Sequence, residues 1–435
     1  MCLPFSFGPT PAQGTTFGIF EGFQRPVAFR DFYSVISMNS WKRKLRMGMV
    51  GGGQGAFIGA VHRLVAALDG QVELAAGVFS RDPQNSRATG AQLYLDPARI
   101  YSSYEAMAAS ETKLPPDKRI DFVSIVTPNN AHFGPAKAFL EAGIHVICDK
   151  PLAFTIEEAE ELERIVERTG LVFALTHNYT GYPMVRHARQ LFQSGEMGTV
   201  RKVIVEYLQD WLMDAEEVRG SKQAAWRTNP AESGIGGAIG DIGTHAINLA
   251  EYVTNDPVVE ICADKTIFVP GRKLDDDCNA LLRLQGGGKG LFTVSQVATG
   301  QENGLRLRVY GSKGSILWAQ EDPNYLHVWR HGKPRETLSR GRSEYLSPEV
   351  MAISRTPWGH PEGYLEAFAN IYVGAVEAIR RHIDGKPMTT AEYAFPTVYD
   401  GVRGMLFIYA VVESADKGAV WVQMQNTSAR TETAK

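Results

Sequence analysis

Residues 45–56 read Leu-Arg-Met-Gly-Met-Val-Gly-Gly-Gly-Gln-Gly-Ala, and this stretch decides the fold. Its first half, Leu45–Val50, is apolar enough for a short strand, and its second half is a glycine-rich turn. Apolar residues at helical spacing follow, so the glycines lie between a strand and a helix. Gly51, Gly53 and Ala56 fit the G-x-G-x-x-G/A pattern, in which the first glycine permits the turn and the second lets a pyrophosphate approach the helix N-terminus. The stretch therefore predicts a dinucleotide-binding βαβ unit.

Strands and helices alternate as far as residue 175. Thr155 and Glu158 have capping-box spacing at the start of one of these helices. Such alternation places parallel strands in one sheet with helices on both faces. We therefore expect an α/β Rossmann domain, a doubly wound parallel sheet, over residues 44–175. Its further strands are expected at Val72–Phe79, Ile120–Val126, Ile144–Cys148 and Leu171–Leu175, with helices at residues 131–142 and 155–168.

The pattern changes after residue 175, because strands then follow one another with turns between them. Such succession predicts a large open, mostly antiparallel sheet, with one face on a core and one face free. We therefore assign residues 176–425 to an α+β domain for substrate binding and oligomerisation. A last helix at residues 395–415 is a candidate to pack back on the Rossmann domain, and residues 426–435 form a tail. The expected strands are Val200–Tyr207, Val258–Ala263, Ala280–Leu284, Leu291–Ala298, Leu305–Tyr310 and Ser315–Trp318, with a further helix at Gly363–His382.

The bulk composition excludes several classes of protein. The chain has 435 residues, and its 45 basic and 48 acidic residues are well mixed and give a formal net charge of −3. It has no basic stripe that would follow phosphates, so a nucleic-acid partner is not expected. No apolar run approaches the roughly eighteen residues of a membrane span. The four cysteines have no C-x-x-C spacing, which favours a reducing, cytoplasmic location and argues against a structural metal site.

Residues 1–43 differ from the rest of the chain. They are rich in Gly, Pro, Phe and Thr, have no helical or strand periodicity, and lack the apolar core of a signal peptide. Met38 begins a stretch that runs straight into the first strand. We therefore expect a disordered extension that is dispensable, or an over-long start, in preference to an arm that docks aromatic residues on a neighbouring subunit.

Polar residues follow the predicted strands at the carboxyl edge of the sheet, where ligands of such folds bind. Residues 127–132 follow one strand, and Ser80 and Arg81 follow another. Arg81 can accept the 2′-phosphate of NADP, whereas Asp82 can turn back to hold the ribose of NAD, so both cofactors stay open. The predicted cofactor-binding residues are Gly51, Gly53, Gln54, Gly55, Ala56, Ser80, Arg81, Thr127, Asn129, His132, Asp149 and Lys150.

Three ionisable residues have the chemistry of a hydride-transfer site. Lys150, at the end of a predicted strand, can hydrogen-bond a reacting oxygen beside a nicotinamide and stabilise developing alkoxide charge. Asp241 and His245 are four residues apart, so a helix that begins at Asp241 would place both on one face. Oxidation of a carbinol needs an acceptor for the hydroxyl proton, and histidine suits this near neutral pH, with a carboxylate to orient it. Four glycines between residues 236 and 243 permit close approach of backbone and ligand, which favours this role over a structural one.

At these segments the chain resembles the Gfo/Idh/MocA oxidoreductases, which include inositol dehydrogenases and glucose–fructose oxidoreductases. The matching segments occur in the family's order and spacing over residues 45–422. The resemblance implies Lys150, Asp241 and His245 as the catalytic group. It also implies a two-domain subunit, a nicotinamide cofactor, and homodimers or homotetramers through the open sheet. Asp149 stands where the family usually has glutamate, which is a conservative difference. The segments are Gly51–Ala56, Thr127–His132, Asp149–Pro151, Thr176–Tyr179, Trp226–Arg227 and Gly240–His245.

Other positions are softer candidates for contact with a substrate. They combine polar groups with aromatic rings of the kind that stack on sugar rings, and no cluster of Arg and Lys near them indicates a phosphorylated substrate. We therefore expect hydride transfer between NAD(P) and a secondary carbinol of a sugar, cyclitol or glycoside. Two alternatives stay open: a glycosidase or lyase that uses transient oxidation, and a non-catalytic sugar sensor. The predicted substrate-binding residues are His177, Asn178, Tyr179, Trp226, Arg227 and His360, with Tyr207–Trp211 and Trp358–Pro361 as further candidate segments.

Overall fold

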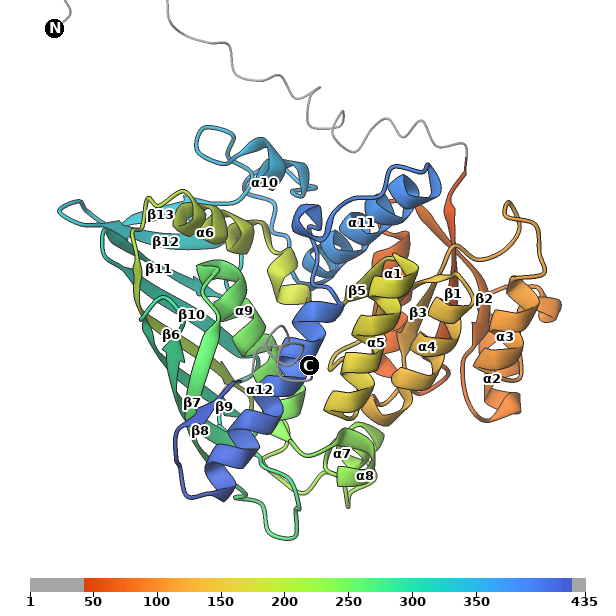
Figure 1. Ribbon diagram of the computed structural model, residues 1–435, viewed down its shortest axis with the longest axis horizontal. Coiled ribbons are helices and arrows are strands. Elements are labelled where there is room, and N and C mark those ends of the chain that lie inside the picture. The colour runs from red at the N-terminus through yellow and green to blue at the C-terminus, as the bar shows by residue number, and fades with distance from the viewer. Residues whose placement is uncertain (1–42, 425–435) are drawn as a thin grey trace, which may run out of the picture. The chain divides into compact units, whose positions relative to one another are not determined.

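The computed structural model describes residues 43–424, and two β-sheets organise them (Figure 1). Residues 1–42 and 425–435 lie outside the described part, so the disordered N-terminal extension and the C-terminal tail stay predictions. Within residues 43–424, no helix is long and apolar enough to cross a membrane.

The first sheet is parallel and has the strand order β2-β1-β3-β4-β5. Every residue of β3 is buried, as expected for an apolar strand that is covered on both faces. The strand order reverses at β1, which lies between β2 and β3, so a ligand crevice is expected at the carboxyl ends of β1 and β3. The predicted Rossmann sheet is confirmed. Its strands are β1 (Leu45–Gly51), β2 (Val72–Val78), β3 (Phe122–Val126), β4 (His145–Cys148) and β5 (Phe173–Leu175).

Helices cover both faces of this sheet. Phe139 of α4 belongs to one buried apolar cluster and Val65 of α1 to another, one on each face. The helix α5 begins where Oγ1 of Thr155 accepts the N–H of Glu158 at 3.2 Å, and it ends at Gly170 with a φ of 64°. Both ends therefore follow the capping signals in the sequence. The helices are α1 (Phe57–Ala67), α2 (Pro83–Gln92), α3 (Tyr104–Glu111), α4 (Phe133–Glu141) and α5 (Ile156–Thr169).

The second sheet has nine strands in the order β13-β12-β11-β10-β6-β9-β8-β7-β14. All neighbours are antiparallel except β6 and β9, which are parallel. In β10, Leu305 and Leu307 are buried while Arg306 between them is exposed, so one face of the strand is turned to the core. The predicted large, mostly antiparallel sheet is confirmed. Its strands are β6 (Val200–Leu208), β7 (Val258–Thr266), β8 (Asp277–Leu284), β9 (Lys289–Ser295), β10 (Gly304–Gly311), β11 (Gly314–Ala319), β12 (Tyr325–Arg330), β13 (Glu336–Ser339) and β14 (Val422–Gln423).

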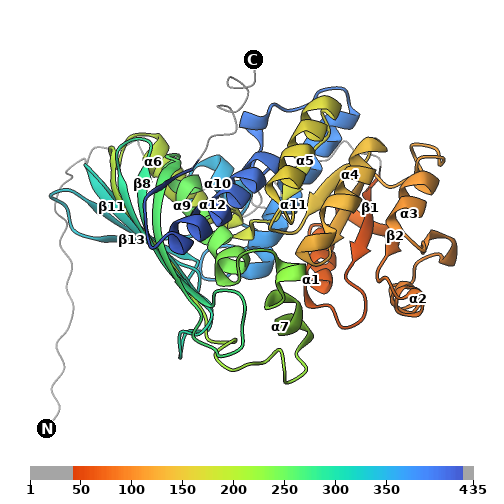
Figure 2. The ribbon, with the colours of Figure 1, turned by 60° about the horizontal axis from the view of Figure 1, so that its bottom comes forward.

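Three helices lie on one face of the second sheet, between it and the Rossmann sheet (Figure 2). Of these, α6 packs against β11 and β12, α9 against β6, and α12 against β7. The last of them, α12, also packs against α5 of the first sheet. Helices of the second half therefore connect the two sheets. The helices are α6 (Pro183–Gln193), α9 (Thr244–Thr254) and α12 (Val398–Asp416), with the short α7 (Lys222–Arg227), α8 (Pro230–Ser233) and α10 (Pro348–Ala352) in the connections.

The chain returns to the first sheet near its C-terminus. The helix α11 (Tyr364–Ile383) packs against α1, and its Phe368 and Ile371 share a buried cluster with Leu45 and Met47 of β1. The segment before α12 then runs beside β5, where N–H of Leu175 donates to the carbonyl of Pro396 at 2.8 Å. These contacts fix the two sheets relative to each other and so define the space between them.

Candidate active site

A cavity of about 1080 Å³ lies between the carboxyl edge of the first sheet and the second sheet. Ligand cavities commonly measure roughly 300–1,000 Å³, so this one has room for a large cofactor together with a small substrate. Most of the predicted site residues line it, namely Gly51, Gly53, Gln54, Gly55, Ala56, Ser80, Arg81, Thr127, Asn129, Asp149, Lys150, Asn178, Tyr179, Trp226, Arg227, Asp241 and His245.

The glycine-rich loop has the backbone geometry that a diphosphate needs. Gly51 has a φ of +88°, and a Cβ on Gly53 would lie only 2.4 Å from Oδ1 of Asn85 and 2.8 Å from the carbonyl oxygen of Phe79. N–H of Gly53 donates to that same carbonyl at 3.0 Å, which fixes the loop against the end of β2. No side chain caps α1, so the positive end of its dipole is left for an anion. The loop therefore fits the pyrophosphate of a dinucleotide.

The end of β2 distinguishes the two side chains that the sequence left open for cofactor choice. Oδ1 of Asp82 accepts the N–H of Gln84 at 2.9 Å and caps α2, and N–H of Asp82 donates to Oγ of Ser80 at 3.1 Å. Ser80 and Arg81 line the cavity, and Asp82 does not. Arg81 is therefore the charged side chain at the end of β2 that lines the cavity.

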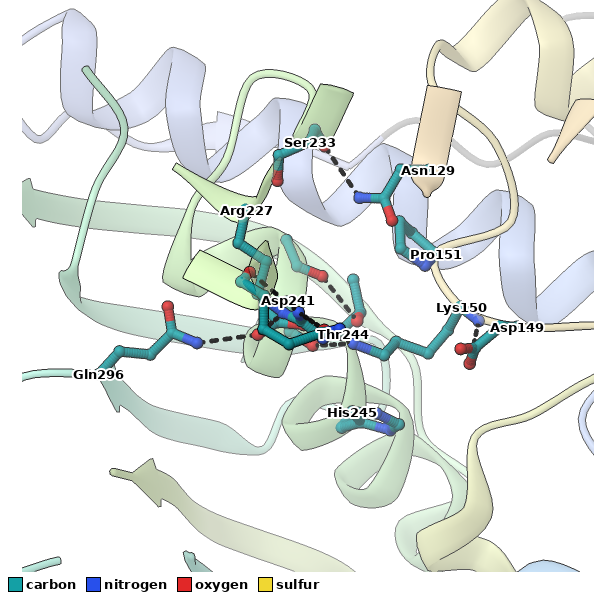
Figure 3. Close-up of polar contacts among 12 residues, drawn as sticks. Asn129, Asp149, Lys150, Pro151, Arg227, Ser233, Asp241, Thr244, His245 and Gln296 are labelled. Carbon is teal, nitrogen blue, oxygen red and sulfur yellow. Dashed lines mark hydrogen bonds and ion pairs between the residues drawn. The ribbon is translucent and has the colours of Figure 1, made fainter. Parts of the chain in front are cut away.

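Lys150 and Asp241 meet across the two sheets. Nζ of Lys150 lies 2.8 Å from Oδ1 of Asp241, and Nζ also donates to the backbone carbonyl of Asp241 (Figure 3). The other carboxylate oxygen accepts from Nε of Arg227 at 3.1 Å and from Nε2 of Gln296 at 2.8 Å. Burial alone would raise the pKa of Asp241, but Arg227 and Lys150 outweigh it and hold that pKa well below its usual range. Asp241 is therefore a carboxylate that anchors two cations.

The segment that carries Asp241 differs from the expected helix start. Residues Ile239–Gly243 form a single π-helical turn, and α9 begins at Thr244. The carboxylate of Asp275 accepts N–H of Gly237 at 2.7 Å and N–H of Ile239 at 2.9 Å, which fixes the entrance to this turn. A Cβ on Gly237 would lie 2.1 Å from the carbonyl oxygen of Asp275. Contacts with the Asp275 segment thus stabilise a π-helical turn, which is wider than the α-helical turn that the spacing of Asp241 and His245 predicted. Such π-turns often occur at functional sites.

The side chain of His245 contacts another histidine. Its Nδ1 lies 3.3 Å from Nδ1 of His177, and its ring meets Tyr179 edge to face with centroids 4.9 Å apart. Burial, followed by the charge of Lys150, lowers the pKa of His245 well below its usual value. The expected orientation of His245 by Asp241 is not seen, because both carboxylate oxygens of Asp241 are engaged elsewhere. His245 is therefore neutral near pH 7 and able to accept a proton.

A network of neutral polar groups forms the wall near His245. The hydroxyls of Tyr179 and Tyr207 are 2.5 Å apart, and Oη of Tyr207 donates to Oδ1 of Asn303 at 2.7 Å. Nε2 of Gln209 donates to the same oxygen at 2.7 Å, and its Oε1 accepts from Nε1 of Trp211 at 3.1 Å. The segment around Tyr207 was a candidate from sequence, but Asn303 was not. It follows a turn with no motif, and only the pairing of β10 with β6 places it here.

Trp226 and Arg227 lie together at the cavity wall. The guanidinium of Arg227 stands over the Trp226 ring at 4.2 Å and 5.7 Å from the Trp211 ring. Because its Nε is also bound to Asp241, Arg227 joins the aromatic part of the wall to the Lys150–Asp241 pair. Sequence reasoning proposed contact of Trp226 and Arg227 with substrate or nicotinamide, and their positions on the cavity are compatible with both.

Two short helices of the second half lie beside the glycine-rich loop and the loop after β3. Nδ2 of Asn129 donates to the carbonyl of Ser233 at 3.0 Å, and Nδ2 of Asn130 donates to that of Ala231 at 3.0 Å. The amide of Asn129 therefore also ties the Rossmann loop to α8. Lys222, at the start of α7, has its Nζ 3.7 Å from the point where a Cβ on Gly55 would lie. It makes no hydrogen bond or ion pair within residues 43–424, and no motif identified it.

Three predicted residues do not line the cavity. His132 is fully buried, with Nδ1 2.7 Å from the carbonyl of Pro151 and Nε2 2.9 Å from that of Thr127, so its ring holds two strand ends together. His360 is exposed, and it is its backbone carbonyl that accepts from Arg340 and Thr356. His177 lies behind His245. For His132 and His177 the sequence could not show this, because a histidine beside a strand end faces the interior or the cavity depending on the turn.

Within residues 43–424, no group of three or more His, Cys, Asp or Glu side chains is arranged to hold a metal ion.

Comparison with known sequences gives a consistent result over both sheets. Residues 45–177 match the oxidoreductase family with an NAD-binding Rossmann fold, and residues 185–317 match the GFO/IDH/MocA C-terminal domain. An uncharacterised oxidoreductase of Bacillus subtilis is 34% identical and covers 88% of this chain and 98% of its own length. A levoglucosan dehydrogenase of Pseudarthrobacter phenanthrenivorans is 28% identical over 89% of this chain and 100% of its own.

Solved structures resemble the chain over the same length. An inositol dehydrogenase homologue of Azotobacter vinelandii, complexed with NAD+, has a TM-score of 0.84 and is 36% identical, covering 88% of this chain and 98% of its own. The same protein has been solved with NADH and myo-inositol. An oxidoreductase of Sinorhizobium meliloti is 45% identical with a TM-score of 0.77, covering 88% and 100% of the two chains.

Proposed function

Because the chain belongs to the Gfo/Idh/MocA oxidoreductase family, we propose that it is an NAD-dependent dehydrogenase of a neutral sugar, cyclitol or glycoside. The reaction removes a hydride from a secondary carbinol. One observation carries the proposal: Lys150 and Asp241 form an ion pair at 2.8 Å in the cavity that also contains the glycine-rich loop and His245.

NAD is the cofactor that we propose. The glycine-rich loop at Gly51–Ala56 would hold its pyrophosphate, Arg81 lies at the adenosine end, and Thr127 and Asn129 line the path toward Lys150. When bound, NAD supplies the acceptor for the hydride. The relatives solved with NAD+ or NADH support this choice, and Arg81 makes NADP the competitor to test.

Lys150 would hold the substrate oxygen that reacts. Its ammonium group is bound to Asp241, so it is kept in place while alkoxide character develops on the substrate. A donor placed in this way stabilises the transition state more than the ground state. Removing such a group costs on the order of 10²-fold in rate.

His245 would accept the hydroxyl proton. It is neutral near pH 7, it lines the cavity, and the Lys150 cation on the same wall disfavours an early positive charge on its ring. Proton transfer to a positioned base contributes roughly 10²–10⁴-fold to rate. Lys150 would thus stabilise the substrate oxygen, and His245 would remove the proton from that oxygen.

The residues that line the cavity favour a neutral polyhydroxylated substrate. Near the reacting position the charged groups balance, because Lys150 and Arg227 face Asp149 and Asp241. The remaining groups are hydroxyls, amides and aromatic rings, which suit hydroxyl groups and the apolar face of a sugar ring. The related levoglucosan dehydrogenase and inositol dehydrogenase homologue, named for or solved with such compounds, support this class.

A panel of neutral polyols and glycosides, with NAD or NADP in excess, tests the proposal through the absorbance of the reduced cofactor. We expect oxidation of at least one cyclitol or anhydrosugar, and loss of turnover in Lys150→Met and His245→Gln with cofactor binding retained. The matched control is His360→Gln, because this histidine is exposed and its side chain does not line the cavity. Retained turnover in both site variants would exclude the mechanism, and release of an aglycone without net reduction would indicate a lyase.

A further inference from the structure

The hydrogen-bond partner of the His245 side chain within residues 43–424 is His177. Their Nδ1 atoms are 3.3 Å apart and their rings meet at 83° with centroids 5.2 Å apart. Both side chains are buried, with 8% and 2% of their surfaces exposed for His245 and His177 respectively. His177 begins the short turn η3 (Asn178–Gly181) that follows β5, whereas His245 lies in the first turn of α9. The contact therefore joins the turn after β5 to the predicted base on α9.

The contact permits two proton arrangements. Burial lowers the pKa of His177 to about 3 and that of His245 well below its usual value, so both rings are neutral near pH 7. Each neutral ring carries one proton, and two facing nitrogens at this distance share one N–H. If His177 donates, His245 keeps its own proton on Nε2 and cannot accept another there. If His245 donates, Nε2 has a free lone pair.

Only the second arrangement makes His245 a base toward the cavity. His245 lines the cavity and His177 does not, so the edge of His245 opposite Nδ1 is the edge left for a ligand. We propose that His177 is a positioning residue that accepts Nδ1–H of His245 and so leaves Nε2 of His245 to receive the substrate proton. This inference rests on the proposed function only in its last step, because the tautomer is a property of the protein alone.

The proton moves from the substrate hydroxyl to His245 in a single step. The O–H bond of the substrate breaks, an N–H bond forms at Nε2 of His245, and Nδ1–H of His245 stays hydrogen-bonded to His177. The other groups that face His245 are Lys150, Asp241 and the rings of Tyr179 and Tyr207. Lys150 disfavours the imidazolium form and Asp241 favours it, so the lone pair of His177 adds to Asp241 in stabilising the proton on His245.

Nitrogen-15 NMR of the histidine-labelled protein without substrate tests the tautomer directly. The chain has ten histidines, and the spectra of His245→Gln and His177→Asn identify the two signals of interest. We expect His245 to be neutral and protonated on Nδ1. A proton on Nε2 of His245 would overturn the proposal. Because this experiment needs no turnover, a failure to oxidise any polyol leaves its outcome intact.

Two variants of His177 add a kinetic test. His177→Asn retains an oxygen that can accept Nδ1–H, whereas His177→Phe retains a ring without an acceptor. We expect kcat to fall on the order of 10²-fold in the Phe variant and to stay within about tenfold of the unchanged enzyme in the Asn variant. The acid limb of the kcat/KM profile should also move to lower pH in the Phe variant, because the imidazolium has lost an acceptor.

A purely structural role of His177 predicts a different result. Both variants would then lose activity equally, with an unchanged pH profile, and that result would overturn the proposal. Thermal unfolding and NAD binding are measured on each variant so that a folding defect is recognised. If the Phe variant does not fold, the NMR tautomer and the pH profile of His177→Asn decide the question.

Discussion

Asp241 binds three other side chains at or beside the cavity. It binds Lys150 at 2.8 Å, Arg227 at 3.1 Å and Gln296 at 2.8 Å, and its side chain is only 12% exposed. Removing one partner from a buried ion pair leaves the charge of the other partner uncompensated. Asp241 therefore determines where the Lys150 ammonium group lies, which is a different task from the orientation of His245 that the sequence predicted.

Asp241→Asn tests this role. The carboxamide can still accept from Lys150, but it carries no charge and offers a donor to Arg227. We expect kcat to fall on the order of 10²-fold while the Kd of NAD changes little. The control is Asp214→Asn, which removes an exposed carboxylate from its pair with Arg219 at 2.8 Å, and exposed pairs contribute little. Equal kcat in the two variants would contradict the assigned role.

A substitution of Arg81 tests whether the protein prefers NAD or NADP. It lines the cavity where the adenosine end of the cofactor would lie, and Asp82 is engaged as a helix cap. We expect Arg81→Ala to raise the Kd of NADP about tenfold, because a charge-assisted contact with a phosphate is lost, and to change the Kd of NAD less than about twofold. Cofactor titration by protein fluorescence measures both. Equal effects on the two cofactors would show that Arg81 does not read the 2′-phosphate.

The sequence predicted the ionisable residues that line the cavity better than it predicted their partners. Lys150 stands at a strand end and His245 four residues from Asp241, so local patterns identified them. Gln296 and Asn303 carry no such pattern, since the register of the second sheet brings Gln296 to Asp241 and Asn303 to the cavity wall. Local sequence therefore predicts which ionisable groups line the cavity, whereas tertiary pairing decides what holds them.

At the scale of secondary-structure elements, the short helices α7 and α8 bring part of the second domain next to the glycine-rich loop. Lys222 lies beside Gly55 and has no partner among residues 43–424. We expect Lys222→Gln to weaken NAD binding about fivefold at low salt, because a rim charge facing a diphosphate is worth roughly 1 kcal/mol. The difference should shrink at high salt, and adenosine, which has no phosphate, should bind both proteins alike.

The matched control for Lys222→Gln is Lys333→Gln, a change of an exposed lysine in a turn of the second sheet. It carries the same charge difference but does not line the cavity. An equal loss of NAD affinity in the two variants would assign the effect to net charge and contradict a local contact.

For the whole molecule, six buried histidines predict loss of stability in acid. Burial lowers the folded-state pKa of each below 6.5, so the unfolded chain binds protons below about pH 6.5 that the folded chain does not. Stability from these groups is therefore complete above pH 6.5 and falls by up to ~1.4 kcal/mol per pH unit for each. Asp275, whose pKa burial raises to about 6, acts in the opposite sense, as do Glu163 and Asp277, whose pKa values burial also raises, but these are three groups against six. The histidines are His62, His132, His145, His177, His187 and His245.

We expect the Tm to fall by at least about 10 °C between pH 7.5 and pH 5.5. His145→Asn should make the fall shallower, because the Asn oxygen can replace Nδ1 as acceptor of the Val172 N–H without taking up a proton. A Tm that is flat or rises toward pH 5.5 would contradict the account. Calorimetry across this range measures it.

The order of strands and helices along the chain predicts the fold class, but it does not predict the long-range contacts that complete the fold. Both sheets were predicted, because alternation and succession of elements are local signals. The short edge strands β13 and β14 lack long apolar runs, and β6 pairs parallel with β9 through contacts distant in sequence. The return of α11 to the first sheet likewise depends on buried contacts such as Phe368 with β1.

The central claim is that one cavity holds the cofactor and a carbinol and that Lys150 acts on the bond that breaks. Single-turnover reduction of NAD by an accepted polyol, with hydrogen or deuterium on the carbinol carbon, tests it most directly in the unchanged protein and in Lys150→Met. The account predicts a slower rate with deuterium, and a rate on the order of 10²-fold lower in the variant at equal NAD occupancy. Reduction by Lys150→Met at the unchanged rate would contradict it.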